Sequence, residues 1–200
     1  MWSASTEVVV AFGPEVAYRR LLGEATARAG RQLLQRLGVM LLVIGIAVPV
    51  MAVQRVTILL VVTAALSWSF VLAIQVTVAA LVIASVPARP IGMLEALNLW
   101  FAAHLPYTVW MLAVSVLMAT SRHASAELLI ASAIVPAAWT FVTVSAFCRV
   151  VLQTGRAGAW WRATAHQLLV WTIALGYVAW AAGGWFQVLA PIARTLSWGP

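Results

Sequence analysis

Three histidines are the residues of this 200-residue chain best suited to chemistry, because it has only five acidic residues and a single cysteine. His104 lies within a long apolar run, two residues before Pro106, and His166 opens the last apolar run. Imidazole nitrogens can ligate a haem iron, a chlorin or a metal ion. If the apolar runs cross a membrane, His104 and His166 share one side of it, whereas His123 falls on the other. His104 and His166 are therefore the candidate cofactor-binding residues.

The alternative is a structural role, in which each imidazole forms a hydrogen bond to a neighbouring helix or at the membrane interface. No carboxylate or cysteine lies nearby in the sequence to complete a set of ligands. Cys148 stands beside Arg149 at the end of an apolar run and is better explained as core packing. We therefore expect the structural role, and we predict neither a bound cofactor nor a metal site.

Motifs of the common enzyme classes do not occur in the sequence, among them H-E-x-x-H, G-x-S-x-G, C-x-x-C and the phosphate-binding glycine loop. The interiors of the apolar runs also lack Asp, Glu, Lys and Arg, although charge inside a membrane usually marks transport or a proton relay. The sequence therefore predicts a protein that is not an enzyme and has no catalytic residues.

Composition indicates that the chain is embedded in a membrane. Hydrophobic residues make up 64% of the sequence and charged residues only 8%, whereas soluble domains carry roughly 25% charged residues. The net charge of +7 comes from arginines at the ends of apolar runs rather than from one basic patch, so we exclude nucleic acid as a partner. We predict an all-α fold, a polytopic transmembrane helical bundle solvated by lipid.

Five apolar runs approach the length of about 20 residues that a helix needs to cross the hydrocarbon of a bilayer. Polar turns and prolines separate them, as at Gln54 and Arg55. The predicted spans are 38–53, 56–86, 97–118, 128–147 and 167–182. They divide the chain into a cytoplasmic N-terminal segment 1–37, a five-span transmembrane domain 38–184 and a C-terminal interfacial tail 185–200.

The N-terminal segment contains a predicted amphipathic helix over residues 14–37. At helical spacing, Tyr18, Leu22 and Leu33 fall on one face, and Arg20 and Arg31 fall on the other. An arginine-rich face opposite an apolar stripe is typical of a helix that lies in the headgroup region. The alternative is a helix that packs on a partner protein.

The arginines also predict an orientation. Nine of them fall on the N-terminal side of the predicted membrane: Arg19, Arg20, Arg28, Arg31, Arg36, Arg89, Arg149, Arg156 and Arg162. Only Arg55, Arg122 and Arg194 fall on the opposite side. Because positive residues concentrate on the cytoplasmic side, the N-terminus is predicted to be cytoplasmic. Arginine without lysine is typical of a GC-rich bacterial genome, so we predict a multi-pass protein of the bacterial inner (cytoplasmic) membrane.

Two stretches resemble those of a known family. The segment Met93-Leu94-Glu95-Ala96-Leu97 leads into a span that contains Leu105-Pro106, and a basic loop from Gly155-Arg156 to Trp161-Arg162-Ala163 precedes the last span. With an N-terminal cytosolic segment and five closely spaced spans, the chain resembles the Ypt-interacting protein (Yip) domain family from about Tyr18 to Gly184. Eukaryotic members of that family act in vesicle traffic with small GTPases. The resemblance implies a non-enzymatic membrane scaffold and assigns no functional residues.

These observations favour a non-catalytic subunit or scaffold that packs against a larger respiratory, photosynthetic or secretory membrane assembly. The expected partners are the lipid bilayer and other membrane proteins. The alternative is a small transporter or permease-like module, in which spans kinked at Pro49, Pro106 and Pro136 surround Gln75 and His104. A membrane enzyme that acts on lipid is the least favoured reading, because acids are so few.

Overall fold

The computed structural model describes residues 4–23, 28–121 and 131–179, and the regular elements among these residues are all helical. This confirms the predicted all-α fold. The elements are α1 (Ala4–Phe12), α2 (Pro14–Gly23), α3 (Ala29–Val53), α4 (Ile58–Ala84), α5 (Met93–Phe101), the 3₁₀ helix η1 (Ala102–His104), α6 (Leu105–Thr120), α8 (Ile134–Val150) and α9 (Arg156–Ala179).

Within the described ranges, three helices are long and apolar enough to cross a membrane. They are α3 with 25 residues, α4 with 27, and the 28-residue stretch Met93–Thr120 that α5, η1 and α6 form together. Helix α8 is apolar but has 17 residues. Helix α9 has 24 residues and begins with Arg156. The structure therefore supports a multi-pass membrane protein and accounts for the first three of the five predicted spans.

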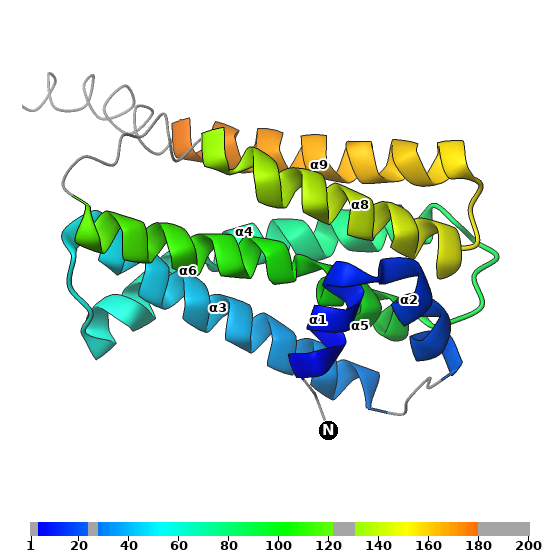
Figure 1. The fold of residues 1–200 in the computed structure, drawn as a ribbon, viewed down its shortest axis with the longest axis horizontal. Helices are drawn as coiled ribbons and strands as arrows, with labels where there is room; N and C mark the ends of the chain where they lie inside the picture. Colours follow the sequence, from blue (N-terminus) through cyan, green and yellow to red (C-terminus); the bar gives the residue numbers. More distant parts are fainter. Residues whose placement is uncertain (1–3, 24–27, 122–130, 180–200) are drawn as a thin grey trace, which may run out of the picture.

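The long helices lie side by side and alternate in direction, so that they form an elongated bundle (Figure 1). Helix α3 packs on α4 and α6, and α9 packs on α4 and α8. The turn between α3 and α4 is tight because of two local features. Gln54 adopts a positive φ of 54° and ends α3, and the Thr57 hydroxyl accepts a hydrogen bond from the Leu60 amide and caps α4.

Helices α1 and α2 lie at the end of the bundle where α3 begins and α8 ends (Figure 1). Arginines gather at the same end, because Arg89 follows α4, Arg149 ends α8 and Arg156 begins α9. One of them joins α2 to α8, with 2.6 Å between Arg149 Nη1 and Glu15 Oε1. In the part of the chain that the structure describes, the opposite end carries Arg55. We call the first end of the bundle the arginine-rich end.

The predicted amphipathic helix 14–37 is wrong as a single element. Residues 14–23 form α2, whereas residues 29–37 are the first turns of α3, which continues to Val53. The reason is packing, since Leu33 and Arg36 are buried in the bundle instead of lying on its surface. The boundary predicted at residues 37 and 38 therefore falls inside α3. Residues 185–200, the predicted interfacial tail, lie outside the described residues.

The prolines predicted to kink the spans lie at helix interruptions or inside a helix. The 3₁₀ helix η1 interrupts the 28-residue stretch Met93–Thr120 directly before α6, and Pro106 occupies the first turn of α6, where its missing amide costs nothing. Pro136 lies in the first turn of α8, directly after a turn at Ala133 that separates α8 from helical residues 131–132. Pro49 lies inside α3, near its end.

The best-packed part of the core lies at the arginine-rich end. Tyr18, Trp100 and Phe147 are fully buried there and come from α2, α5 and α8. The Phe147 ring centroid is 5.6 Å from that of Tyr18 and 5.1 Å from that of Trp100, both in edge-to-face geometry, which aromatic pairs prefer. Burial raises the pKa of the Tyr18 hydroxyl well above its usual value, so the hydroxyl stays protonated and donates to the Leu99 carbonyl at 3.4 Å.

Candidate functional site at two buried histidines

The structure brings His104 and His166 together. His104 is the last residue of η1, and His166 lies in the third turn of α9. Both side chains are 2% exposed. Their ring centroids are 6.2 Å apart and the ring planes are nearly perpendicular, at 85°. The third histidine, His123, lies outside the described residues.

Three nitrogens of this histidine pair have no hydrogen-bond partner among the described residues. They are Nδ1 of His104 and both Nδ1 and Nε2 of His166. A buried polar atom without a partner costs about 1–3 kcal/mol of folding free energy. The two imidazoles therefore lower the stability of the fold unless a ligand occupies their nitrogens. Structural histidines of the kind that the sequence predicts would instead each bond to a neighbouring helix.

Aromatic rings enclose both imidazoles. The Phe101 ring stacks on His104 with centroids 4.9 Å apart and an interplanar angle of 22°. The Trp100 ring meets His166 in edge-to-face geometry at 5.0 Å. These rings keep the nitrogens in an apolar environment, where any ligand that they bind is shielded from competing water.

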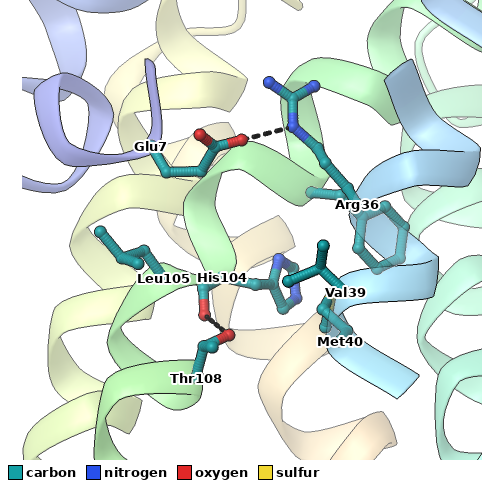
Figure 2. Close-up of a pocket in the computed structure, with 8 residues that line it drawn as sticks. Glu7, Arg36, Val39, Met40, His104, Leu105 and Thr108 are labelled. Atoms are coloured by element: carbon teal, nitrogen blue, oxygen red, sulfur yellow. Dashed lines mark hydrogen bonds and ion pairs between the residues drawn. The ribbon is translucent and has the colours of Figure 1, made fainter. Parts of the chain in front are cut away.

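A cavity of about 110 Å³ opens next to His104 (Figure 2). Apolar and polar groups share its wall, and Arg36 and Glu7 face each other across one side of it (Figure 2). Its lining consists of Glu7, Arg36, Val39, Met40, Phe101, His104, Leu105 and Thr108. The cavity thus lies between α1, α3 and the α5–η1–α6 stretch.

Arg36 is the centre of a buried polar network beside this cavity. Its Nε donates to Glu7 Oε1 at 2.7 Å, and the two side chains are only 6% and 10% exposed. Its Nη1 donates to the Asn98 carbonyl at 2.8 Å and also to the side-chain oxygen of Asn98. The amide nitrogen of Asn98 in turn donates to Gln32 Oε1 at 2.9 Å. The network therefore ties α1 and α5 to α3.

The sequence pattern did not identify this network. The arginine asymmetry predicts only a cytoplasmic position for Arg36, and it does not select Glu7 or Asn98. A signal was available for Asn98, because an amide within an apolar helix needs a partner. None was available for Glu7, because residues 1–12 show no clear helical periodicity that would place α1 against the bundle.

A second group of polar contacts lies next to the histidines and joins α6 to α9. Tyr107 receives a hydrogen bond from Trp171 Nε1 at 3.2 Å, and its hydroxyl donates to Gln167 Oε1 at 3.4 Å. Gln167 directly follows His166, and Tyr107 lies one turn after His104. These contacts fix the position of α9 against α6, and with it the position of the two imidazoles.

The geometry limits what the histidines can hold. The cavity beside His104, at about 110 Å³, is too small for a haem or chlorin, because pockets for drug-sized ligands begin at roughly 300 Å³. No group of three or more His, Cys, Asp or Glu residues that could hold a metal ion occurs among the described residues. The cavity beside His104 can therefore take only a small ligand, and few side chains are available to bind it.

No protein-family model, curated protein or solved structure matches this chain.

Proposed function

We propose that the chain is a non-catalytic integral membrane subunit or scaffold that packs against a larger membrane assembly. The observation that carries this proposal is the outward face of α4. This 27-residue helix is the longest in the described part of the chain, and only 28% of its most apolar window is buried. Most of its surface is thus available to lipid or to another protein.

Small hydroxyl residues on that face favour a protein partner over lipid alone. Thr63, Ser67 and Thr77 are exposed on α4, between large exposed side chains such as Leu66 and Leu81. Helices associate in membranes through small residues that allow close approach and through Ser and Thr side chains. We call Thr63, Ser67 and Thr77 the hydroxyl face of α4.

The buried polar groups support a scaffold rather than an enzyme, because they connect helices to one another. Arg36 joins α3 to α1 and α5. Trp139 Nε1 donates to the Ala11 carbonyl at 2.8 Å and joins α8 to α1. The resemblance to the Yip domain family agrees with this role, since it too implies a non-enzymatic membrane scaffold.

The proposal includes five spans with a cytoplasmic N-terminus, in the bacterial inner membrane. Alternation of α3, α4, α5–α6, α8 and α9 along the bundle supports the five crossings (Figure 1). The concentration of arginines at the end that carries α1 and α2 supports the orientation.

Purification from native membranes in mild detergent tests the proposal. A photo-crosslinking amino acid at Ser67 should join the chain to a different membrane protein and give one discrete product. That membrane protein should also be recovered with the chain in stoichiometric amount. The same amino acid at Val116, an exposed apolar position on α6, is the matched control and should give lipid adducts only. A chain that purifies alone, or only with copies of itself, would contradict the proposal.

A small transporter is the second candidate, because the structure places a charged pair inside the bundle. Arg36 and Glu7 are buried next to the cavity beside His104, and buried ionisable residues in membrane helices often mark a substrate path. Purification distinguishes the two functions, since a transporter is expected alone or as a homo-oligomer.

A further inference from the structure

Arg162 lies at the α4–α9 seam, the line along which the end of α4 packs on the first turns of α9. Its Nε donates to Ser85 Oγ at 3.0 Å, and its Nη1 donates to the Gly158 carbonyl at 3.1 Å. The Ser85 hydroxyl in turn donates to the Val82 carbonyl at 2.7 Å. Gly158 makes room for the guanidinium, because a Cβ atom added there would lie 3.1 Å from Arg162 Nη1. These contacts fix the direction of the Arg162 side chain, and both of its acceptors are neutral.

The positive charge of Arg162 has no carboxylate partner among the described residues. The ion pairs described above join α1 to α3 and α2 to α8, and neither reaches the α4–α9 seam. Arg89 follows Ser85 by four residues and adds a second positive charge at the same end of the bundle. Glu95, the acid nearest to Arg89 along the chain, accepts a hydrogen bond from the Gly92 amide at 3.2 Å. The seam is therefore a positively charged surface that the described residues do not neutralise.

The end of α4 places the Arg162 guanidinium at the depth of lipid headgroups. Ser85 directly follows α4, whose 27 residues extend over about 40 Å, whereas the hydrocarbon of a bilayer is about 30 Å thick. The end of α4 therefore extends beyond the hydrocarbon. Trp160 and Trp161 directly precede Arg162 and are 52% and 71% exposed, which is typical of tryptophans at a membrane interface.

An apolar flank of α9 continues from Arg162 toward the middle of the membrane. Leu169 and Ile173 follow Arg162 by seven and eleven residues, so they lie on the same side of the helix, and they are 46% and 43% exposed. A guanidinium next to such a flank matches a phospholipid, whose acyl chains extend inward from its phosphate. Guanidinium groups are well suited to bind phosphate, and basic sites between membrane helices on the cytoplasmic side bind anionic headgroups.

We propose that Arg162 binds the phosphate of one anionic phospholipid of the cytoplasmic leaflet at the α4–α9 seam, with an acyl chain along Leu169 and Ile173. The site rests on the membrane position and the orientation in the proposed function, but it requires no partner protein. A chain that purifies alone would therefore contradict the scaffold and leave the lipid site in place.

Native mass spectrometry of the purified full-length chain in mild detergent, titrated with phosphatidylglycerol, tests the site. The native chain should bind one phosphatidylglycerol per polypeptide, and more tightly than phosphatidylcholine, whose ammonium group compensates the phosphate. Arg162→Gln should weaken binding about tenfold, because it removes a charge-assisted hydrogen bond. Ser85→Ala keeps every charge but removes a contact that positions Arg162, so it should weaken binding about threefold.

The matched control is Arg149→Gln, which removes one positive charge from the same end of the bundle and should bind the lipid like the native chain. An equal loss in Arg149→Gln would overturn the proposal, because binding would then follow the overall charge. Unchanged binding in Arg162→Gln or in Ser85→Ala would also overturn it. Two outcomes with the native chain do so without any variant: equal binding of phosphatidylcholine, and displacement of the lipid by inorganic phosphate, which would assign the site to a free anion.

Discussion

At the scale of single residues, Arg36 shows why burial determines the importance of a charge. Its guanidinium and the Glu7 carboxylate are almost completely shielded from solvent, and the backbone and side chain of Asn98 accept further hydrogen bonds from it. The ion pair Arg149–Glu15 has a similar contact distance, but its side chains are 43% and 42% exposed. Solvent screens the second pair and leaves it a contribution of about 0–1 kcal/mol.

The two pairs allow a matched test. Arg36→Met should lower the free energy of unfolding by about 3–5 kcal/mol, because it leaves the buried Glu7 carboxylate without its cationic partner. Arg149→Met should lower it by at most about 1 kcal/mol, because water replaces the lost contact. Chemical unfolding in detergent, followed by circular dichroism, measures both. Similar losses for the two variants would show that Arg36 is not shielded as the structure indicates.

A double variant separates the charge from the packing. If the cost of Arg36→Met arises from the loss of the guanidinium beside the Glu7 carboxylate, then Glu7→Leu in the same chain should recover a substantial part of the loss. No recovery would instead assign the cost to the contacts of Arg36 with Asn98.

At the scale of helices, the close approach of α3 and α4 depends on Gly45. A Cβ atom added there would lie 2.7 Å from the Val61 carbonyl oxygen and 3.2 Å from Ala65 Cβ. The first contact is shorter than non-bonded atoms allow, and a backbone oxygen in a helix cannot turn away. Small residues at such positions let membrane helices pack backbone to backbone.

Gly45→Ala should therefore destabilise the bundle by about 1–3 kcal/mol through overpacking. The matched control is Gly38→Ala, seven residues earlier in α3, where an added Cβ meets no atom within 4 Å. That variant should be neutral or more stable by up to about 1 kcal/mol, because Ala is the better helix former. Unfolding curves of the two variants in the same detergent measure the difference in stability. A Gly45→Ala protein as stable as Gly38→Ala would refute the close packing of α3 on α4.

The elements also show what the sequence can and cannot predict. Long apolar runs predicted α3, α4 and the α5–α6 stretch, because lipid burial leaves a strong compositional signal. The sequence also placed His104 and His166 on one side of the bundle, since helix direction alternates from span to span. Helix α1 was not predicted, and residues 29–37 were assigned to an interfacial helix instead of to α3, because tertiary contacts such as Glu7 with Arg36 bring both segments into the bundle. The partnerless nitrogens of His166 depend on packing and leave no trace in the sequence.

At the scale of the whole molecule, the lengths and packing of α8 and α9 determine how many times the chain can cross the membrane. Helix α8 has 17 residues and is about 26 Å long at a rise of about 1.5 Å per residue, slightly less than the hydrocarbon thickness of about 30 Å. Helix α9 has 24 residues and reaches about 36 Å, so it can cross even if its first turns, with Arg156 and Arg162, stay at the interface. Both helices pack along the same bundle as α4 (Figure 1), and an interfacial position would separate them from it.

Reporter fusions test this topology at five positions. Fusions after Arg55 and Arg122 should report outside, and those after Arg89 and Arg156 should report inside, because each crossing reverses the side. The fusion after Arg89 is the control, since it is inside whether the chain has three spans or five. The fusion after Arg156 is decisive: if α8 does not cross, this position stays outside with Arg122. Pro200 should report outside, because α9 then carries the chain across a fifth time, and a cytoplasmic signal there would mean that α9 lies along the membrane instead.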